Sequence, residues 1–443
     1  MRFVVDLLYL LAGLAISPMV LYRVIRHGRY RTGWGQRFGK ISRKSPQKKC
    51  IWLHAVSVGE VNAAKTLIKE LENRFPDFEI IISTTTDTGF AQANALFGHD
   101  FQVFYFPLDL SWVMHRAFNN IRPAVCLLME LEVWPNFVEI AQKLNVPVIV
   151  INGRISDKSF SRYKKIKPIA KTIFRKVGLV LAQTNEYARR FKELGCPDEK
   201  VVVTGSLKYD TAQITDKVEG ADELAAQLFG KSEIRNLKSE IFLWVAGATG
   251  PGEEEIILDV FKELIKQFGN LRLVIVPRKP ERFDEVAQLI KETGFLLIRY
   301  SQIKKLAPET TEKSSIVNRQ SSIVILGDTM GDLRKFYSLA TIIFVGRSLV
   351  PMGGSDMMEA AALGKCTIFG PYTFNFQQTV DALLADNGAI MVKDEEDLLR
   401  TMQKCLLEPA YADKIARNGQ QVIRKNQGAT TKTIDQIAAF LNG

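Results

Sequence analysis

Short apolar segments alternate with amphipathic helical segments along most of this sequence, and the alternation occurs twice. The first series starts at Cys50–Ala55 and ends at Val201–Thr204, and the second starts at Ile241–Ala246 and ends at Cys366–Phe369. Short apolar strands separated by helices predict a parallel sheet that is covered on both faces. A chain of 443 residues is also too long for one ordinary domain. We therefore expect an α/β protein with two doubly wound domains, which face each other across a ligand-binding cleft.

The composition excludes several classes of protein. Hydrophobic residues make up 47% of the chain and charged residues 24%, which excludes a mostly disordered chain and a polytopic membrane protein. The five cysteines are scattered without a C-x-x-C pair, and no two of the four histidines stand at metal-ligand spacing. We therefore expect a reducing compartment, without a disulfide scaffold or a zinc site.

The amino-terminal part of the chain has a pattern typical of membrane attachment. A largely apolar segment, interrupted by Asp6, runs from Phe3 to Tyr22, and about 20 apolar residues suffice to span a bilayer as a helix. Ten Lys or Arg and no acidic residue lie between Arg23 and Lys49, so the net charge of +11 leaves 11 − 10 = +1 for the rest.

We expect residues 1–22 to form a membrane anchor helix, with an interfacial helix as the alternative. Residues 23–49 would then be a basic juxtamembrane collar that attracts anionic headgroups, and the bulk of the protein would lie in the cytoplasm. A nucleic-acid binder would instead spread its basic patch over a folded domain, so we expect no nucleic-acid partner.

The two series also set the expected domain limits. We assign residues 50–225 to an amino-terminal domain and residues 226–443 to a carboxyl-terminal domain. The final helical segments, Glu395–Leu407 and Tyr411–Leu441, are expected to pack back across the first domain. The polar run Lys304–Ser322 has no periodicity and is expected to be an exposed loop.

Three charged residues follow strands of the first series. Ser57 and Glu60 have the spacing of a capping box, in which both side chains satisfy free backbone amides. The alternative is that Glu60 faces the ligand site as a general base. Glu130 directly follows an apolar strand and is either part of a structural ion pair or a carboxylate of the site. Lys208 is either a solvated lysine or a cation directed at the same place.

The second series carries glycine-containing loops but neither of the two common nucleotide motifs, G-x-x-x-x-G-K-[ST] and G-x-G-x-x-G. Gly327–Leu333 and Pro351–Glu359 each follow a strand and open a helix, whose free amides could bind a phosphate while a carboxylate chelates ribose hydroxyls. Arg278 follows another strand and either grips a phosphate or belongs to an ordinary basic loop. Together these loops favour a nucleotide ligand.

Several motifs, in order along nearly the whole chain, resemble the Kdo transferases, which move 3-deoxy-D-manno-octulosonic acid (Kdo) onto a lipid A precursor. The motifs are "GWGQRFG" at Gly33–Gly39, "HAVSVGE" at His54–Glu60, "STTTDTG" at Ser83–Gly89, "MELEVWPN" at Met129–Asn136, Asn152-Gly153-Arg154, "TGSLKYD" at Thr204–Asp210, "AGATGPGEEE" at Ala246–Glu255, "VPRKPERF" at Val276–Phe283, "GDTMGDL" at Gly327–Leu333 and "FVGRSLVPMGG" at Phe344–Gly354.

The resemblance implies a GT-B glycosyltransferase with two Rossmann-like domains, an acceptor-binding amino half and a CMP-sugar-binding carboxyl half. The implied donor is CMP-Kdo and the acceptor is lipid IVA, with inversion at the transferred sugar and neither a metal nor another cofactor. The implied location is the cytoplasmic face of the inner membrane, where lipopolysaccharide is assembled.

The resemblance also implies roles for individual residues. Glu60 matches the proton acceptor of the family, and Glu130 and Lys208 match groups that stabilise the transition state. The residues that match CMP contacts are Pro277, Arg278, Met330, Gly331, Asp332, Asp356, Met357, Met358 and Glu359.

One motif departs from the family pattern, because Ser355-Asp356-Met357-Met358 stands where relatives typically read His-Asn-Pro-Leu. A carboxylate beside a bound phosphate is unfavourable, so we expect Asp356 to cap the following helix by accepting backbone amides, as Asn would. Two other functions fit some of these features: a transferase or epimerase that uses a UDP-sugar, and a membrane-tethered nucleotide-binding regulator without turnover.

Overall fold

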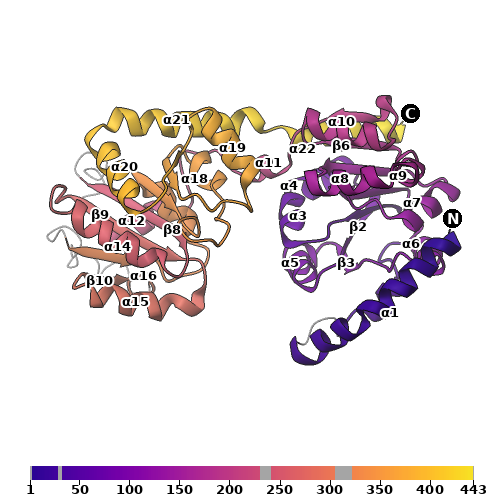
Figure 1. Cartoon of the computed structure of the whole chain (residues 1–443), viewed down its shortest axis with the longest axis horizontal. Helices are drawn as coiled ribbons and strands as arrows, with labels where there is room; N and C mark the ends of the chain where they lie inside the picture. Colours follow the sequence, from indigo (N-terminus) through magenta and orange to yellow (C-terminus); the bar gives the residue numbers. More distant parts are fainter. Residues whose placement is uncertain (1, 28–31, 230–240, 305–321, 443) are drawn as a thin grey trace. The chain divides into compact units, whose positions relative to one another are not determined.

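The computed structural model describes residues 2–27, 32–229, 241–304 and 322–442, which belong to two compact units (Figure 1). Unit 1 comprises Met1–Thr211 and Asn426–Gly443, and unit 2 comprises Ala212–Lys425. The units therefore divide before the expected limit of 225/226, because α12 (Ala221–Phe229) packs against α17 (Leu333–Leu339) of unit 2. The loop expected at 304–322 lies, apart from its two ends, outside the described residues.

Unit 1 is built on a seven-stranded parallel sheet with the order β3-β2-β1-β4-β5-β6-β7. Each apolar segment of the first series forms one of these strands, as predicted. The chain order reverses beside β1, whose neighbours are β2 and β4, and this reversal is the topological switch point of the sheet. The strands are β1 Lys49–His54, β2 Phe78–Thr84, β3 Gln102–Tyr105, β4 Val125–Met129, β5 Val148–Gly153, β6 Leu179–Ala182 and β7 Val201–Val203.

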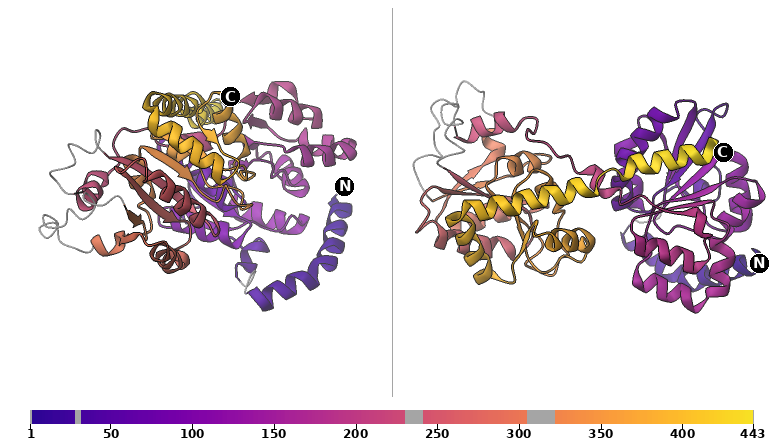
Figure 2. Two further views of the ribbon diagram at one scale, coloured as in Figure 1. Left: turned by 60° about the vertical axis from the view of Figure 1, so that its left-hand side comes forward. Right: turned by 90° about the horizontal axis from the view of Figure 1, so that it is seen from above.

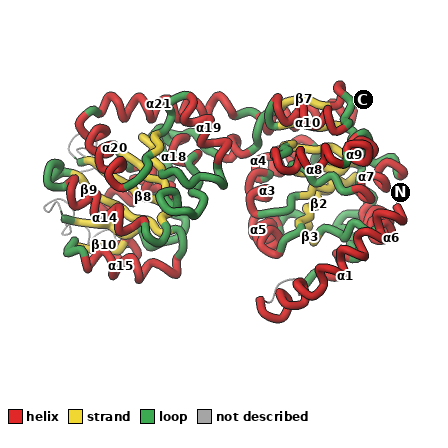
Figure 3. The backbone as a smooth tube through the Cα atoms, in the orientation of Figure 1, coloured by secondary structure: helices red, strands yellow, loops and turns green. Residues whose placement is uncertain are grey.

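Helices cover both faces of this sheet, as Figure 3 shows. Trp52 lies at the centre of one apolar layer, where its ring meets Phe104, Phe106, Phe118 and Phe137. The helices on this face are α6 Ser111–Ile121, α7 Pro135–Lys143, α8 Asp157–Lys165, α9 Lys167–Phe174 and α10 Asn185–Leu194, and those on the other face are α3 Val58–Ala63, α4 Lys65–Arg74, α5 Asp87–Phe97 and α22 Ala429–Asn442.

The expectation for Glu395–Leu407 was wrong, because this segment forms α20 within unit 2. The other expected final helix, Tyr411–Leu441, is two helices, which belong to different units. α21 (Pro409–Asn426) lies in unit 2, whereas α22 packs against α4 in unit 1 (Figure 2). The break occurs at Gly428, whose φ of 97° favours glycine. Asp210 fixes the start of α22, since its carboxylate accepts the N–H groups of Gly428 and Thr430. The carboxylate of Asp210 therefore ties the end of the chain to unit 1.

Unit 2 repeats the architecture with a parallel sheet in the order β10-β11-β9-β8-β12-β13-β14 and a switch point between β8 and β12. The strands are β8 Phe242–Thr249, β9 Leu271–Pro277, β10 Leu296–Arg299, β11 Ile323–Leu326, β12 Ile342–Val345, β13 Cys366–Phe369 and β14 Ile390–Met391. The short β14 has no counterpart in the predicted strands. The core on one face is closed by α14 Glu253–Leu264, α15 Phe283–Glu292 and α20 Glu395–Leu407, and the other carries α12, α17 and α18 Met358–Ala362.

The amino-terminal helix α1 (Arg2–His27) packs along α6 and α7 of unit 1. Asp6, which interrupts the apolar segment, accepts hydrogen bonds from the backbone N–H of Ser111 at 2.9 Å and the side-chain amide of Asn136 at 2.9 Å. Among the described residues, no helix has both the length and the apolarity needed to cross a bilayer. The spanning anchor expected at residues 1–22 is thus not confirmed.

Two arginines of the expected basic collar have structural partners. Arg37, in the short helix α2 (Trp34–Arg37), is 6% exposed, donates to the carbonyl of Thr85 at 3.2 Å and lies 4.2 Å from the ring centre of Tyr105. Arg43 forms a buried ion pair with Glu79 at 2.7 Å. These two side chains hold the part of the collar around Arg37 and Arg43 against unit 1. Contrary to our expectation, their charges are therefore not free to bind headgroups.

Candidate active site

The loops that follow β1 and β4 meet at the switch point of unit 1, and each carries a carboxylate. Glu60 lies in the first turn of α3, after β1. Its Oε2 accepts the backbone N–H of Val56 at 3.0 Å, and its Oε1 accepts the hydroxyl of Ser57 at 2.9 Å. Because Ser57 donates to Glu60 and makes no side-chain bond to the helix amides, the reciprocal capping box suggested by the sequence does not form.

The environment of Glu60 suits proton transfer. Burial raises the pKa of its carboxyl to about 7, opposed by the hydrogen bonds from Val56 and Ser57 and reinforced by the nearby charges of Glu130 and Glu132. A carboxyl with a pKa near neutrality can both take up and release a proton under physiological conditions.

Glu130 begins the loop after β4, where its φ of 54° turns the chain sharply. Its backbone N–H donates to the carbonyl of Ile151 on β5 at 3.0 Å, which fixes the turn to the sheet edge. Strained backbone of this kind is frequent at functional sites.

Glu132 is a third carboxylate of this site, and we did not single it out from the sequence. Its Oε2 accepts the indole N–H of Trp134 at 2.8 Å and lies 3.9 Å from Nε2 of His54. Burial raises the pKa of Glu132 and lowers the pKa of His54 to about 3, so His54 is a neutral wall of the site. The Glu-x-Glu spacing after an apolar strand was the signal that could have identified this residue.

Lys208 opens the short helix α11 (Lys208–Thr211), which packs against α3, the helix of Glu60. The preceding residue, Leu207, donates its N–H to Oδ1 of Asn152 at 3.1 Å, so the end of β5 holds the start of α11. Several buried polar atoms near the ends of these strands have no hydrogen-bond partner among the described residues; they belong to Thr84, Thr85, Asn152, Arg154, Gln183, Thr204 and Ser206. A bound polar ligand could satisfy them.

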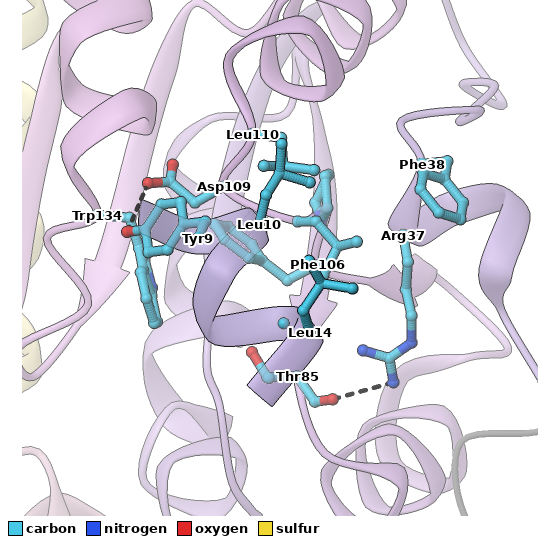
Figure 4. Close-up of a pocket in the computed structure, with 13 residues that line it drawn as sticks. Tyr9, Leu10, Leu14, Arg37, Phe38, Thr85, Phe106, Asp109, Leu110 and Trp134 are labelled. Atoms are coloured by element: carbon cyan, nitrogen blue, oxygen red, sulfur yellow. Dashed lines mark hydrogen bonds between the residues drawn. The ribbon is translucent and has the colours of Figure 1, made fainter. Parts of the chain in front are cut away.

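Unit 1 contains an apolar pocket of about 540 Å³, which Figure 4 shows with its lining residues. Two of these residues connect the pocket to the carboxylate cluster. Trp134 lines the pocket and donates to Glu132, and Phe106 lines it while its ring stacks on His54 with 3.9 Å between centroids. The polar groups at the wall include Arg37, bonded to Thr85, and Asp109, bonded to Tyr9. The remaining lining residues are Leu10, Gly13, Leu14, Phe38, Pro107, Leu108 and Leu110. Pockets of this size and character bind small molecules or parts of larger ones.

In unit 2, one buried carboxylate organises the loops at the switch point. Glu253, the first residue of α14, accepts the backbone N–H groups of Gly250, Ser348 and Leu349 at 2.7–3.0 Å and also that of Arg347. It therefore joins the loop after β8 to the loop after β12.

The predicted CMP contacts lie on loops at this sheet edge, but their side chains differ in availability. Pro277 ends β9 and is buried, whereas Arg278 is exposed and its N–H donates to the carbonyl of Thr249 at 3.1 Å. Met330 is 65% exposed and precedes Gly331, whose φ is 87°. Asp332 is buried and accepts from Lys304, Lys335 and Thr329, so its carboxylate braces the loop.

The loop after β12 contains the remaining predicted contacts. Asp356 Oδ1 accepts the N–H of Met358, the first residue of α18, at 2.9 Å, so its carboxylate accepts a backbone amide as expected. The residue at the N-cap position itself is Met357. The side chains of Met357 and Met358 are buried in the core. Glu359 is about one-third exposed and lies 3.8 Å from Arg334, and burial raises its pKa. Only Asp356 and Glu359 of these four thus offer accessible polar side chains.

The described ranges contain no group of three or more His, Cys, Asp or Glu residues placed to hold a metal ion. The structure brings Glu60 and Glu130 together with Glu132 in unit 1, and places Lys208 on an element that contacts the Glu60 helix.

Two doubly wound units with polar loops at their switch points define an architecture shared by GT-B glycosyltransferases and related enzymes. The chain is similar to a Staphylococcus aureus MnaA structure with UDP, at 15% identity and a TM-score of 0.54, over 89% of this chain and 97% of that one. It is also similar to UDP-GlcNAc 2-epimerase from Neisseria meningitidis, at 15% identity and a TM-score of 0.52, over 88% and 100%. At this identity the likeness concerns the fold alone.

Sequence comparison defines the family. Residues 32–211 match the family model of 3-deoxy-D-manno-octulosonic-acid transferase. The chain is 35% identical to the 3-deoxy-D-manno-octulosonic acid transferase of Haemophilus influenzae over 97% of both chains, and 30% identical to a probable mitochondrial enzyme of that name from Arabidopsis thaliana, over 94% of this chain and 91% of the relative. The chain belongs to the Kdo transferase family and is a glycosyltransferase.

The role of Glu253 gives a prediction about stability. Glu253→Ala removes the acceptor of four backbone N–H groups and leaves them buried without partners, which should lower the free energy of unfolding by about 3 kcal/mol or more. Thermal unfolding of the full chain measures this change. The matched control is Glu255→Ala on the exposed side of the same helix, which should cost less than about 0.5 kcal/mol. Equal effects of both substitutions would contradict the role of Glu253.

Proposed function

We propose that this protein transfers Kdo from CMP-Kdo to the lipid A precursor lipid IVA in lipopolysaccharide biosynthesis. The observation that carries the acceptor assignment is the apolar pocket beside the Glu60, Glu130 and Glu132 cluster. A sugar acceptor that also bears acyl chains would present a hydroxyl to the carboxylates and an acyl chain to the pocket. A purely polar acceptor would leave the pocket without a use.

In the proposed reaction, the acceptor hydroxyl oxygen forms a bond to the anomeric carbon of Kdo while the bond from that carbon to the phosphate of CMP breaks. The electron pair of the broken bond leaves with CMP, and attack from the opposite side inverts the configuration. Glu60 takes the hydroxyl proton, for which its pKa of about 7 is suited.

The other site residues act on charge and position. Lys208 stabilises the negative charge that develops during CMP departure, and Glu130 stabilises the positive charge that develops on the sugar. Arg278, the backbone of Met330-Gly331 and the capped start of α18 bind CMP, and Glu359 accepts ribose hydroxyls. Pro277, Asp332, Met357 and Met358 support this donor site through the backbone, since their side chains are buried.

Membrane attachment is part of the proposal, because the acyl chains of the acceptor remain in a bilayer. Helix α1 exposes Leu7, Leu8, Leu11 and Leu14, each with at least 54% of its area accessible. This exposed apolar row supports a location of α1 in the interface at the cytoplasmic face of the inner membrane.

A UDP-sugar enzyme is the competing function, since solved structures with UDP share the fold. Competition by free nucleotides separates the two: CMP should inhibit transfer and UDP should not.

The acceptor assignment is tested by incubating the protein with CMP-Kdo and either lipid IVA or its deacylated, water-soluble form, and reading Kdo additions by mass spectrometry. Gly13 lines the pocket, and a Cβ atom at this position would meet no other atom within 4 Å, so Gly13→Leu adds an apolar side chain at the pocket wall. Excluding two methylenes of an acyl chain costs about 1.6 kcal/mol, so the KM for lipid IVA should rise at least about tenfold.

The KM for the deacylated acceptor should stay unchanged in Gly13→Leu. Ala12→Leu introduces the same side chain at the preceding position of α1 and serves as the matched control, because Ala12 does not line the pocket. Equal KM increases for both acceptors would show that the pocket does not hold an acyl chain.

The role of Glu60 is tested by Glu60→Gln, which should lower kcat by at least about 10²-fold while the fold is retained. In the unsubstituted protein the base must be deprotonated, so the rate should rise about tenfold per pH unit below pH 7 and level off above it. Ser57→Ala removes a hydrogen bond to the carboxylate, raises the pKa further and should move the midpoint to higher pH. Near-normal turnover in Glu60→Gln would refute the assignment.

The donor site gives a prediction that compares two carboxylates. Asp356→Asn keeps the acceptor for the Met358 amide and should change the KM for CMP-Kdo by less than about tenfold, or about 1.4 kcal/mol. Glu359→Ala removes the proposed ribose contact and should cost more than Asp356→Asn. Steady-state kinetics with CMP-Kdo as the varied substrate decide this. A hundredfold tighter donor in Asp356→Asn would indicate a site built for a different ligand.

A further inference from the structure

Helices α8 and α9 form a strongly basic surface in unit 1 that none of the functions above uses. Residues 158–175, which we call the α8–α9 patch, contain seven Lys or Arg residues and no acidic residue. All seven side chains are exposed, and within the described part of the chain none of them forms an ion pair. The patch therefore concentrates charge over two short helices.

The carboxylates around the patch are already engaged by other cations. Asp157, at the start of α8, and Glu186 both bind Arg190, whose side chain is 7% exposed. Glu139 on α7 binds Lys143 and Lys176. These pairs leave the positive charge of the patch uncompensated within unit 1.

The patch also has an apolar tip. Ile166, between the two helices, and Ile169, in the first turn of α9, are 46% and 54% exposed. Ile166 stands between Lys165 and Lys167, and Ile169 follows Lys167 by two residues. The aromatic residues of α8, Phe160 and Tyr163, instead pack against the core. A single-stranded nucleic acid would need exposed aromatic rings on which bases stack, whereas branched aliphatic residues flanked by lysines suit the boundary between headgroups and acyl chains.

The patch lies on the same face of the sheet as α1. Helix α7 contacts both α1 and α9, and Tyr9 of α1 and Tyr163 of α8 are close enough to interact electrostatically. Helix α1 and the patch are therefore neighbours in unit 1.

We infer that the α8–α9 patch is a second membrane-contact surface, which binds the anionic headgroups of a lipid bilayer and inserts Ile166 and Ile169 at the headgroup boundary. Each basic residue near an anionic membrane contributes about 1 kcal/mol of attraction. The second contact would fix the rotation of unit 1 about α1 and hold the apolar pocket toward the bilayer.

The test measures partition of the full chain onto vesicles of phosphatidylcholine, with or without phosphatidylglycerol, by co-sedimentation. The combined variant Lys164→Gln, Lys165→Gln, Lys167→Gln should bind the anionic vesicles about 10- to 100-fold more weakly. The matched control removes the same charge from α21 with Lys414→Gln, Arg417→Gln, Arg424→Gln, which should change partition less than threefold, by about 0.6 kcal/mol at most. Equal losses in the two variants would overturn the inference, because only net charge would then matter.

Insertion is tested by an environment-sensitive fluorophore on Ile169→Cys, since the five native cysteines are buried. Its emission should shift to the blue on anionic vesicles, whereas the same label on Arg417→Cys should not respond. No shift at residue 169, or a patch variant that loses binding to an RNA oligomer while vesicle binding is unchanged, would refute the membrane contact. In the patch variant, the rate of Kdo transfer to a detergent-dispersed acceptor should stay within about twofold of that of the unsubstituted protein, a difference of about 0.4 kcal/mol. A failure of the membrane contact can therefore be distinguished from a failure of the proposed function.

Discussion

The site in unit 1 depends on one topological constraint, the reversal of strand order between β1 and β4. Because the connections from these neighbouring strands depart in opposite directions, no helix covers the gap between their carboxyl ends. The loops after the two strands can thus bring Glu60, Glu130 and Glu132 together at a partly buried edge. Burial, more than any single neighbour, then raises the pKa of Glu60 to about 7. The same geometry that opens a ligand site also tunes its acid–base chemistry.

Much of the fold could be predicted, because strands buried on both faces leave a strong apolar signal. Every predicted strand segment is present, whereas the two-residue β14 has too few residues to produce a pattern. The division between units could not be predicted, since it depends on the packing of α12 against α17, and the return of α22 depends on Asp210 and Gly428. Contacts between residues far apart in sequence leave no local signal.

Sequence reasoning gave the positions of the candidate site in part, and its gaps share a cause. Sequence reasoning identified positions near the strand ends but could not tell which side chains are already bonded. In the sequence, Asp332 looks like a ligand contact, but in the structure its carboxylate already accepts from three donors. The spacing of Ser57 and Glu60 suggests a structural capping box, but in the structure Ser57 donates to Glu60 instead. Likewise, the net charge of +1 outside residues 23–49 concealed the α8–α9 patch, because acidic residues elsewhere cancel it in the sum.

The apolar pocket and the carboxylate cluster share walls, and this has a consequence for the proposed reaction. Phe106 and Trp134 line the pocket on one side and contact His54 and Glu132 on the other. An acyl chain in the pocket would displace water from these rings and lower the local polarity around the carboxylates. Since desolvation is the main cause of the raised pKa of Glu60, acceptor binding would make this residue a stronger base. A lipid acceptor would in this way increase the basicity of the group that activates it, which a deacylated sugar could not do.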